Sequence, residues 1–371
     1  MSSYPIELLD YELPSELIAQ EPLDDRSASR MLHVIRNSGE IIHRNFRDLP
    51  KLLRIGDVLV LNDSKVIPGR IRGRKLTGGS VEIVVLKEMD EYRFEVIAEV
   101  RGGLKKGDRY LLVNDFLIEV EWAEQGGPRG IIKATAYLPK CHDEEQFKLD
   151  DMHPAAELEE PLFLEMFYSG GEMPIPPYIK RQSEFPDRYQ TVYALNRGSA
   201  AAPTAGLHFT QEVLDEIARR GVDIQRITLH IGIGTFLPIR SEDLAMHKMH
   251  KEEYRVSEEA AEAIIKAIRE GRRIVAAGTT TVRTLEAVFS PCNCSVDGTP
   301  FKLKGETDLF IFPGYNFKVV GAMLTNFHLP KSTLLAMVYA FGGRNVIRNA
   351  YQSAISERYR FYSFGDCMLI E

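Results

Sequence analysis

The stretch VIPGRIRGRKLTGGSVEIVVLKE (66–88) begins a series of strand-sized segments that decides the fold. Four more segments follow at similar spacing: YRFEVIAEV (92–100), DRYLLV (108–113), FLIEVEWA (116–123) and GIIKATAYL (130–138). Turn-forming residues separate them at Gly78-Gly79, Asp90-Glu91, Gly102-Gly103, Asn114-Asp115 and Gly126-Gly127-Pro128. Six short strands without a helical period between them predict a separate antiparallel β domain, either a small barrel or a sandwich.

The segments on both sides of this β domain have a different pattern. GDVLVLND (56–63) reads as a buried strand. Further along, Thr210 and Ser257 each precede a helical pattern that ends at a glycine, Gly221 or Gly271, and a strand-like segment follows each helix. This alternation is typical of a sheet flanked by helices.

A stretch rich in acidic residues connects the two patterns. Residues 142–160 contain eight acids and few large apolar side chains, which predicts an exposed linker. We therefore expect a three-layer α/β domain, residues 1–63 plus 156–371, interrupted by an inserted six-stranded β-barrel domain, residues 64–155.

Composition narrows the class of protein. The 371 residues are 44% hydrophobic and 27% charged, and no apolar run is long enough for a membrane span. The N-terminal residues lack the basic and apolar regions of a signal peptide, so we expect a cytoplasmic protein. The formal charge of −7 argues against indiscriminate polyanion binding, so a nucleic-acid partner needs a local basic face.

The cysteines give no sign of a metal site. Cys141, Cys292, Cys294 and Cys367 have neither the density of a disulfide scaffold nor the paired spacing of a zinc site. We expect no bound metal.

Two stretches concentrate the chemistry. GSAAAPTAGLHFT (198–210) and TLHIGIGTFLPIR (228–240) each combine a histidine, His208 or His230, with glycines and hydroxyl groups. Because glycine loses the most conformational entropy on folding, such clustering is better explained by a ligand site than by a scaffold.

Several motifs, taken in order, carry a family resemblance. They are RSASRML (26–32), VLNDSKVIPGRI (60–71), PTAGLHFT (203–210), LHIGIGTFLPIR (229–240), MHKMHKEEY (246–254), GTTTVRTLE (278–286), TNFHLPKSTLL (325–335) and ERYRFYSFGDCMLI (357–370). In that order they resemble the S-adenosylmethionine:tRNA ribosyltransferase-isomerases of queuosine synthesis, over nearly the whole chain. The family's fold implies an α/β domain interrupted by a β-barrel.

The resemblance implies a specific reaction. The ribosyl unit of S-adenosylmethionine is transferred to 7-aminomethyl-7-deazaguanine at the anticodon wobble position of a tRNA with a GUN anticodon. There it becomes an epoxycyclopentanediol, and adenine and methionine leave. S-adenosylmethionine is then a substrate, and no prosthetic group is expected. The sulfonium acidifies the neighbouring carbon, so a modest base is sufficient.

Neutral imidazole suits that base, so His208 and His230 are the candidate acid and base, with a supporting hydrogen-bonding role as the alternative for each. For the S-adenosylmethionine site we expect Thr204, Gly206, Gly232, Gly234, Thr235, Thr279, Thr280, Thr281, Arg283, Asn326 and His328.

Three groups of these residues keep an alternative. Gly232 and Gly234 form a GxG that lacks the third glycine of a dinucleotide fingerprint, so they either allow close backbone approach or form a tight turn. The threonines from Thr279 to Thr281 and Arg283 either bind the ligand at a helix N-terminus or act as an N-cap and a solvated arginine. His328 either faces a cleft or caps the next turn.

Candidate tRNA contacts are basic and aromatic. They are Arg70, Arg72, Arg74 and Lys75, then Lys105, Lys106 and Arg109, and finally Lys180, Arg181 and Tyr189, with Tyr193 beside it. Strand alternation puts Arg70, Arg72 and Arg74 on one face, either as a phosphate-binding stripe or as an ordinary solvated face. The tyrosines either stack on an anticodon base or belong to the core.

Two other classes of function are open to test. An S-adenosylmethionine methyltransferase would produce S-adenosylhomocysteine, but the glycine-rich adenosyl loop of that class is missing. A noncatalytic RNA-binding module would tolerate substitution of His208 and His230.

Overall fold

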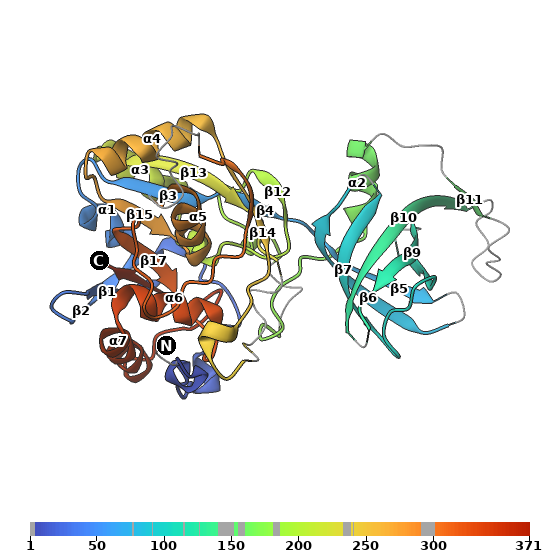
Figure 1. The fold of residues 1–371 in the computed structure, drawn as a ribbon, viewed down its shortest axis with the longest axis horizontal. Helices are drawn as coiled ribbons and strands as arrows, with labels where there is room; N and C mark the ends of the chain where they lie inside the picture. The colour runs from blue at the N-terminus through green and yellow to red at the C-terminus, as the bar shows by residue number, and fades with distance from the viewer. Residues whose placement is uncertain are drawn as a thin grey trace. The chain divides into compact units, whose positions relative to one another are not determined.

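The computed structural model describes residues 4–75, 78–90, 92–113, 116–125, 127–139, 152–154, 160–180, 186–232, 239, 241–290 and 301–371. The chain forms two compact units (Figure 1). One comprises 1–65, 175–197 and 201–371, and the other comprises 66–174 and 198–200.

The second unit contains a closed antiparallel β-barrel. Its strands are β5 (Arg70–Lys75), β6 (Ser80–Glu88), β7 (Arg93–Val100), β8 (Arg109–Leu112), β9 (Phe116–Ala123) and β10 (Arg129–Pro139). The strand order is β10-β7-β6-β5-β8-β9, and β10 also pairs with β9, which closes the barrel. The six predicted strands and the inserted barrel are confirmed. A further short strand, β11 (Met152–Pro154), pairs with β10.

One helix of this unit was missing from the sequence-based expectation. Helix α2 (Glu160–Ser169) packs the Phe163 and Phe167 rings against the barrel interior. Phe167 stacks on Phe94 with ring centroids 4.4 Å apart, and Phe163 meets Phe116 edge-on at 5.2 Å. The i and i+4 aromatic spacing is the signal for this helix.

The first unit is built on a nine-stranded sheet, ordered β16-β14-β13-β3-β15-β17-β18-β1-β2. These strands are β1 (Arg30–Ile35), β2 (Glu40–Asn45), β3 (Val58–Asn62), β13 (Asp223–Leu229), β14 (Glu252–Val256), β15 (Ile274–Ala277), β16 (Lys304–Thr307), β17 (Ala322–Asn326) and β18 (Cys367–Ile370). The neighbours β13, β3, β15 and β17 are parallel to one another. Strands β4 (Ser64–Val66) and β12 (Asn196–Ser199) form a separate pair.

Helices cover both faces of the large sheet. They are α1 (Leu49–Leu52), α3 (Gln211–Arg219), α4 (Glu258–Arg269), α5 (Thr279–Phe289), α6 (Thr333–Gly342) and α7 (Arg344–Ser356). Short 3-10 turns add Ile6–Leu9, Ser15–Leu17, Arg26–Ala28, Phe46–Asp48, Pro186–Arg188, Thr204–His208 and Leu244–Met246.

Because side chains alternate along a strand, the residues of β3 contribute to a separate hydrophobic core on each face of the sheet. Leu59 and Leu61 of β3 join the core under α1 and α3. Val58 and Val60 join the opposite core under α4 to α7. The unit is therefore a three-layer α/β structure, as expected.

The predicted helix caps are also present. Thr210 accepts a hydrogen bond from the Val213 N–H at 3.4 Å, and Ser257 accepts one from the Ala260 N–H at 3.2 Å. Gly221 follows α3 with a φ of 79°. In the part of the chain that the structure describes, no helix has the length and apolar character needed to span a membrane.

Candidate active site

The chemistry predicted from the sequence gathers at one edge of the large sheet. Strands β13, β3, β15 and β17 are parallel, so their carboxyl ends meet at the same edge. His230 follows β13, Thr279 follows β15 and Asn326 ends β17. In open α/β sheets, ligands bind beyond the carboxyl ends of the strands.

A small cavity lies among these strand ends, and we call it the threonine cavity. Among the residues lining it are Thr204, Thr279, Thr280, Asn326 and His328, all predicted from the sequence. Its volume is about 30 Å³. That is room for about one water molecule, so an adenosyl group needs this cavity to widen.

The threonines at the start of α5 are largely held by the protein itself. The hydroxyl of Thr281 bonds the Ala277 carbonyl at 2.7 Å. The hydroxyl of Thr280 accepts a bond from the Asn62 amide at 3.2 Å. Gly278 precedes the helix with a φ of 94°, a conformation that favours glycine. The helix start is therefore fixed before any ligand binds.

Arg283 lies inside the protein rather than in solvent. It is 1% exposed and forms an ion pair with Glu252. The other carboxylate oxygen of Glu252 accepts the Gly232 N–H at 3.3 Å. Arg283 therefore anchors the segment that follows His230, and the alternative of a solvated arginine is wrong.

Asn62, at the end of β3, joins the elements of the site and was missed by sequence reasoning. Its side-chain amide donates to the Leu229 carbonyl at 3.0 Å and to Thr280. Its oxygen accepts the Leu229 N–H at 3.0 Å and the Ser64 N–H at 3.1 Å. The side chain is fully buried and uses all its hydrogen-bonding capacity. The available signal was a polar triplet directly after the buried strand VLVL.

Asp63 is a second residue that sequence reasoning missed. Its carboxylate accepts the Thr228 hydroxyl at 2.7 Å and the Asn196 amide at 3.1 Å. The backbone N–H groups of Leu195 and Asn196 bond its carbonyl. These bonds hold the buried Asp63 side chain in place close to His230.

His230 lies half-buried in a larger cavity of about 360 Å³, which we call the histidine cavity. It is lined by Asn196, Arg197, Thr228, His230, residues 253–255 and residues 304–306. The Nδ1 atom of His230 lies 2.8 Å from the Ser64 hydroxyl. Its Nε2 atom has no hydrogen-bond partner among the residues that the structure describes. Burial lowers the pKa of His230, and the Glu253 and Asp63 carboxylates oppose that shift.

His208 has a different environment. Its Nδ1 lies 2.7 Å from the Ser29 hydroxyl and its Nε2 lies 3.2 Å from the Asn326 amide nitrogen. The Asn326 amide also donates to the Tyr362 carbonyl at 3.1 Å, so Nε2 of His208 accepts and Nδ1 carries the proton. Burial, followed by the Arg26 and Arg360 charges, lowers the pKa of His208 to about 3. It is a neutral imidazole with both nitrogens engaged.

His328 is also buried at this edge. Its Nε2 lies 2.7 Å from the Thr325 hydroxyl, and its backbone N–H donates to the Tyr351 hydroxyl at 2.9 Å. Burial lowers the pKa of His328 to about 3. It lines the threonine cavity, as the cleft-facing alternative expects.

The glycines of the two histidine stretches have different explanations. A Cβ atom on Gly206 would lie 2.2 Å from the Tyr193 hydroxyl, so packing alone requires glycine there. A Cβ atom on Gly232 would meet nothing within 4 Å. Gly234 and Thr235 lie outside the described residues, so their role stays a prediction.

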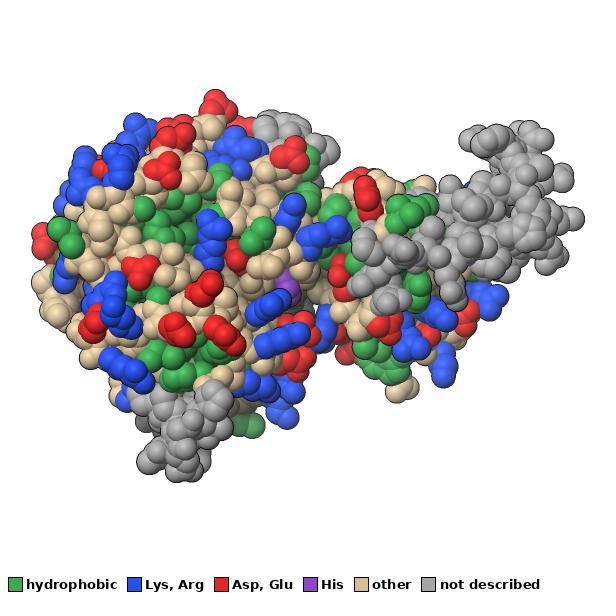
Figure 2. All heavy atoms as spheres, turned by 90° about the horizontal axis from the view of Figure 1, so that it is seen from above, with side chains coloured by type: hydrophobic (Ala, Val, Ile, Leu, Met, Phe, Trp, Pro, Cys, Tyr) green, Lys and Arg blue, Asp and Glu red, His purple; other side chains and the backbone are tan. Residues whose placement is uncertain are grey.

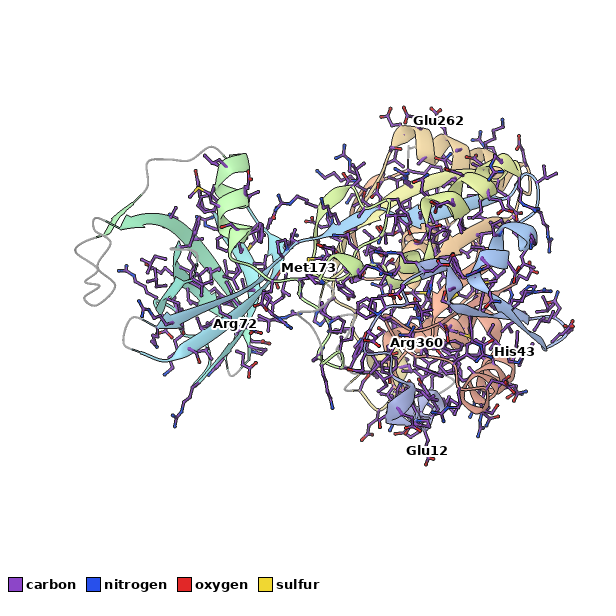
Figure 3. All side chains as sticks on the ribbon, turned by 180° about the vertical axis from the view of Figure 1, so that it is seen from behind. Glu12, His43, Arg72, Met173, Glu262 and Arg360 are labelled. Carbon is purple, nitrogen blue, oxygen red and sulfur yellow. The ribbon has the colours of Figure 1, made fainter. Side chains whose placement is uncertain are left out.

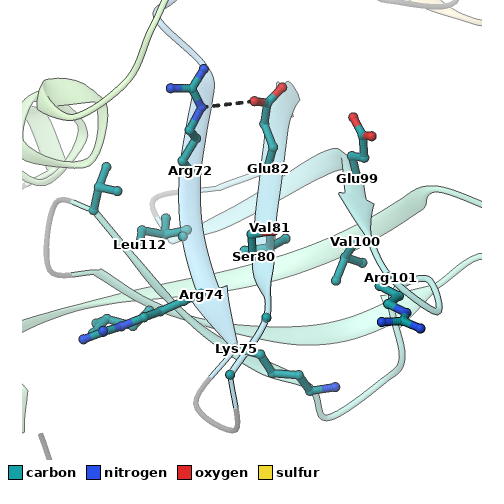
Figure 4. Close-up of a pocket in the computed structure, with 15 residues that line it drawn as sticks. Arg72, Arg74, Lys75, Ser80, Val81, Glu82, Glu99, Val100, Arg101 and Leu112 are labelled. Atoms are coloured by element: carbon teal, nitrogen blue, oxygen red, sulfur yellow. Dashed lines mark hydrogen bonds and ion pairs between the residues drawn. The ribbon is translucent and has the colours of Figure 1, made fainter.

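The basic residues of barrel strand β5 are partly neutralised by acidic neighbours. Arg70 and Arg72 both pair with Glu82, each at 3.3 Å, and Lys75 pairs with Asp108 at 2.9 Å. Arg72, Arg74 and Lys75 line a hollow of about 1140 Å³ on the barrel (Figure 4). Arg72 also pairs with Glu172 at 3.2 Å.

The remaining tRNA candidates differ in accessibility. Lys180 is exposed, and Arg181 lies outside the described residues. Tyr189 is 0% exposed and packs edge-on against Phe364, so stacking of this ring on an anticodon base is not supported. Tyr193 is buried as well. Both tyrosines are core residues, the alternative considered for them.

The charges of the chain are interspersed over the face shown in Figure 2. Figure 3 shows Arg72 on the barrel and Arg360 in the α/β unit. Among the residues that the structure describes, no three His, Cys, Asp or Glu side chains are grouped to hold a metal ion. Cys367 is buried and free, whereas Cys141, Cys292 and Cys294 lie outside the described residues.

The matches to known proteins cover nearly the whole chain. The family model described as "Queuosine biosynthesis protein" matches residues 6–370. A curated protein of Symbiobacterium thermophilum, named S-adenosylmethionine:tRNA ribosyltransferase-isomerase, is 48% identical over 97% of this chain and 98% of its own length. A protein of the same name from Clostridioides difficile is 44% identical over 97% of this chain and 98% of its own.

A solved structure agrees with these relatives. The crystal structure of S-adenosylmethionine tRNA ribosyltransferase from Thermotoga maritima is 34% identical and has a TM-score of 0.53. The match covers 98% of this chain and 100% of that one. The family match, the curated relatives and the common fold lead to one conclusion: this chain is an enzyme that belongs to the queuosine biosynthesis protein family.

Proposed function

We propose that the protein transfers the ribosyl unit of S-adenosylmethionine to 7-aminomethyl-7-deazaguanine at the wobble position of a tRNA with a GUN anticodon. Adenine and methionine leave, and the transferred unit becomes an epoxycyclopentanediol. The names of the curated relatives support the two substrates. A tRNA substrate places the reaction in the cytoplasm.

The observation that carries this proposal is the environment of His230. Ser64 fixes one ring nitrogen at 2.8 Å, and the imidazole lines a cavity large enough for a nucleoside. Burial lowers its pKa and keeps it neutral at physiological pH. A neutral, oriented imidazole with one nitrogen uncommitted is equipped to take the proton from the carbon beside the sulfonium.

His208 then has a positioning role. It orients the Asn326 amide through its Nε2 atom, and Asn326 lines the threonine cavity. The side-chain oxygen of Asn326 is buried and has no hydrogen-bond partner among the described residues. Such an oxygen suits a donor of the adenosyl group, either a ribose hydroxyl or the exocyclic amine, because a buried acceptor without a partner costs free energy.

The burial of the groups around the threonine cavity suits a reactive intermediate. Excluding water prevents premature hydrolysis once the proton has left the carbon. We assign to Thr279 and Thr280, which line the threonine cavity, the hydrogen bonds that stabilise the departing adenine.

The test is incubation of the enzyme with S-adenosylmethionine and tRNA that carries the aminomethyl-deazaguanine. We expect release of adenine and methionine in equal amounts, with the ribosyl unit retained on the tRNA. The His230→Gln variant should lose this release while remaining folded. Formation of S-adenosylhomocysteine instead would identify a methyltransferase and contradict the proposal.

A further inference from the structure

The histidine cavity has an unusual arrangement of charge. In the register of β14 and β16, Arg255 lies directly opposite Lys304 and Glu253 lies directly opposite Glu306. Like charges opposite each other in an antiparallel pair are destabilising. All four side chains are exposed and line the cavity.

Among the described residues, the repulsion between Arg255 and Lys304 is not offset by ion pairs with acidic residues at diagonal positions of the two strands. Arg255 and Lys304 form no ion pair with any residue of the described ranges. Glu306, in contrast, pairs with Lys251 at 3.7 Å. Departures from local pairing rules are concentrated at functional sites, and two uncompensated cations on a cavity wall suit an anion.

The pairing of β13 with β14 also shows where the charged side chains of the cavity lie relative to His230. The His230 N–H donates to the Glu253 carbonyl at 3.0 Å, so His230, directly after β13, lies beside Glu253 of β14. Arg255 lies opposite Thr228, two positions back along the strand. The cavity therefore has carboxylates beside the imidazole and cations roughly 7 Å further along.

We infer that this cavity binds the acceptor nucleotide of the RNA substrate, with a backbone phosphate on Arg255 and Lys304 and the aminomethyl group beside Glu253 and His230. This inference rests on the proposed function, because it assigns the acceptor of that reaction to a place. An ammonium group and an anion are the chemistry that the cavity recognises.

Two substrates of the proposed reaction carry both groups. The methionine part of S-adenosylmethionine has its ammonium and carboxylate on one carbon, which is a shorter separation than that of the two charge pairs. The aminomethyl base and the phosphate of a nucleotide lie further apart. The spacing along the strand therefore favours the nucleotide.

The first experiment measures binding of aminomethyl-bearing tRNA as a function of salt. Arg255→Ala and Lys304→Ala should each reduce the slope of log K against log salt, and the double variant should reduce it by about one, because both cations contact the same phosphate. The KM for S-adenosylmethionine should stay unchanged. Lys266→Ala, an exposed lysine on α4 outside the cavity, is the matched control and should keep the wild-type slope.

The second experiment separates the amine from the phosphate. Glu253→Gln keeps the backbone bond to His230 but removes the carboxylate charge. It should raise the KM for aminomethyl-bearing tRNA about tenfold, with unmodified tRNA binding unaffected. Arg255→Ala should weaken both tRNAs equally.

Two results would overturn the inference. One is an unchanged salt slope in both cation variants of an enzyme that releases adenine normally. The other is a raised KM for S-adenosylmethionine with an unchanged KM for tRNA, which would assign the cavity to the methionine group. Failure of the proposed function is a different result, since wild-type enzyme would then release no adenine.

Discussion

The two ends of the parallel strands in the α/β unit are built from different chemistry. At the amino ends, Asp57 precedes β3 and pairs with Arg273, which precedes β15, with an Nε to Oδ1 distance of 3.1 Å. Arg273 also pairs with Glu371, and Glu371 accepts from His33 at 2.9 Å. At the carboxyl ends an ion pair between Arg283 and Glu252 is also buried, but Asn62 and His230 themselves contact amide, hydroxyl and backbone groups.

We relate this difference to two roles, stabilisation of the fold at one end of the strands and the reaction at the other. A paired charge network is costly to rearrange, because removing one partner leaves a buried charge uncompensated. Hydroxyl and imidazole groups can exchange donor and acceptor roles as a proton moves. The amino ends therefore stabilise the sheet, and the carboxyl ends are suited to proton transfer.

The largest expected effect comes from His230→Gln at the carboxyl end. Loss of a general base reduces kcat by about 10²–10⁴-fold. The side chain is half-buried, so urea denaturation should show little change in the free energy of unfolding. A variant with normal kcat would show that the proton goes elsewhere.

At the amino end, Asp57→Asn should have the opposite profile. Breaking a buried ion pair costs about 3–5 kcal/mol of folding free energy, and Asp57 is 3% exposed. Urea denaturation measures this loss, and kcat at a temperature where the variant is folded should match wild type. A parallel fall in kcat would remove the distinction between the two ends.

Sequence reasoning reached the fold because local signals agree with the global structure. Gly78 and Gly79, in the β5–β6 turn, have φ values of 92° and 100°. Such values favour glycine, so the glycine pair in the sequence predicts the turn. Helix α2 was missed because its aromatic face packs on a barrel distant in sequence, as with Phe94 and Phe167.

The site was only partly predictable for a related reason. His208 and His230 could be selected by residue type, but their partners could not. Ser64 lies 166 positions from His230 and Ser29 lies 179 positions from His208. Only the folded sheet shows that one imidazole keeps a nitrogen uncommitted and that the other does not. The spacing of Tyr189 and Tyr193 left base stacking and burial in the core both open, and the folded structure shows that both rings are buried.

An intermediate effect is expected from Asn62→Ala, which loosens the carboxyl end without touching the imidazole. Ser64 and Thr280 lose their common anchor, and a small displacement of reacting groups costs up to about 10²-fold in rate. The kcat of Asn62→Ala, Ser64→Ala and the double variant should therefore be non-additive. Additive losses in kcat would show that Asn62 does not act through Ser64.

The smallest effect concerns pH. The folded pKa of His208 is about 3, below its unfolded value of about 6.5. As the pH falls below 6.5, the unfolded chain binds a proton that the folded chain does not, so stability decreases until the pH nears 3. Glu371, whose folded pKa is lowered by its partners, contributes stability that is lost only below about pH 4.5.

Between pH 6.5 and 4.5 the two ends can therefore be told apart. His208→Gln should reduce the slope of unfolding free energy against pH by up to about 1.4 kcal/mol per pH unit. The contribution of the Glu371 carboxylate itself changes only below about pH 4.5, so Glu371→Gln should alter the profile mainly at lower pH. Denaturation series at each pH measure both slopes, and an unchanged slope in His208→Gln would mean that His208 is charged in the folded protein.

The most direct test of the assignment of chemistry to the carboxyl ends is a crystal structure of the enzyme with S-adenosylmethionine bound. The account predicts the adenosyl group beside Asn326 and Thr280, with the Nε2 atom of His230 roughly 3–3.5 Å from the ribose carbon attached to sulfur. A ligand bound at the amino ends of the strands, or with His208 nearer to that carbon than His230, would contradict it.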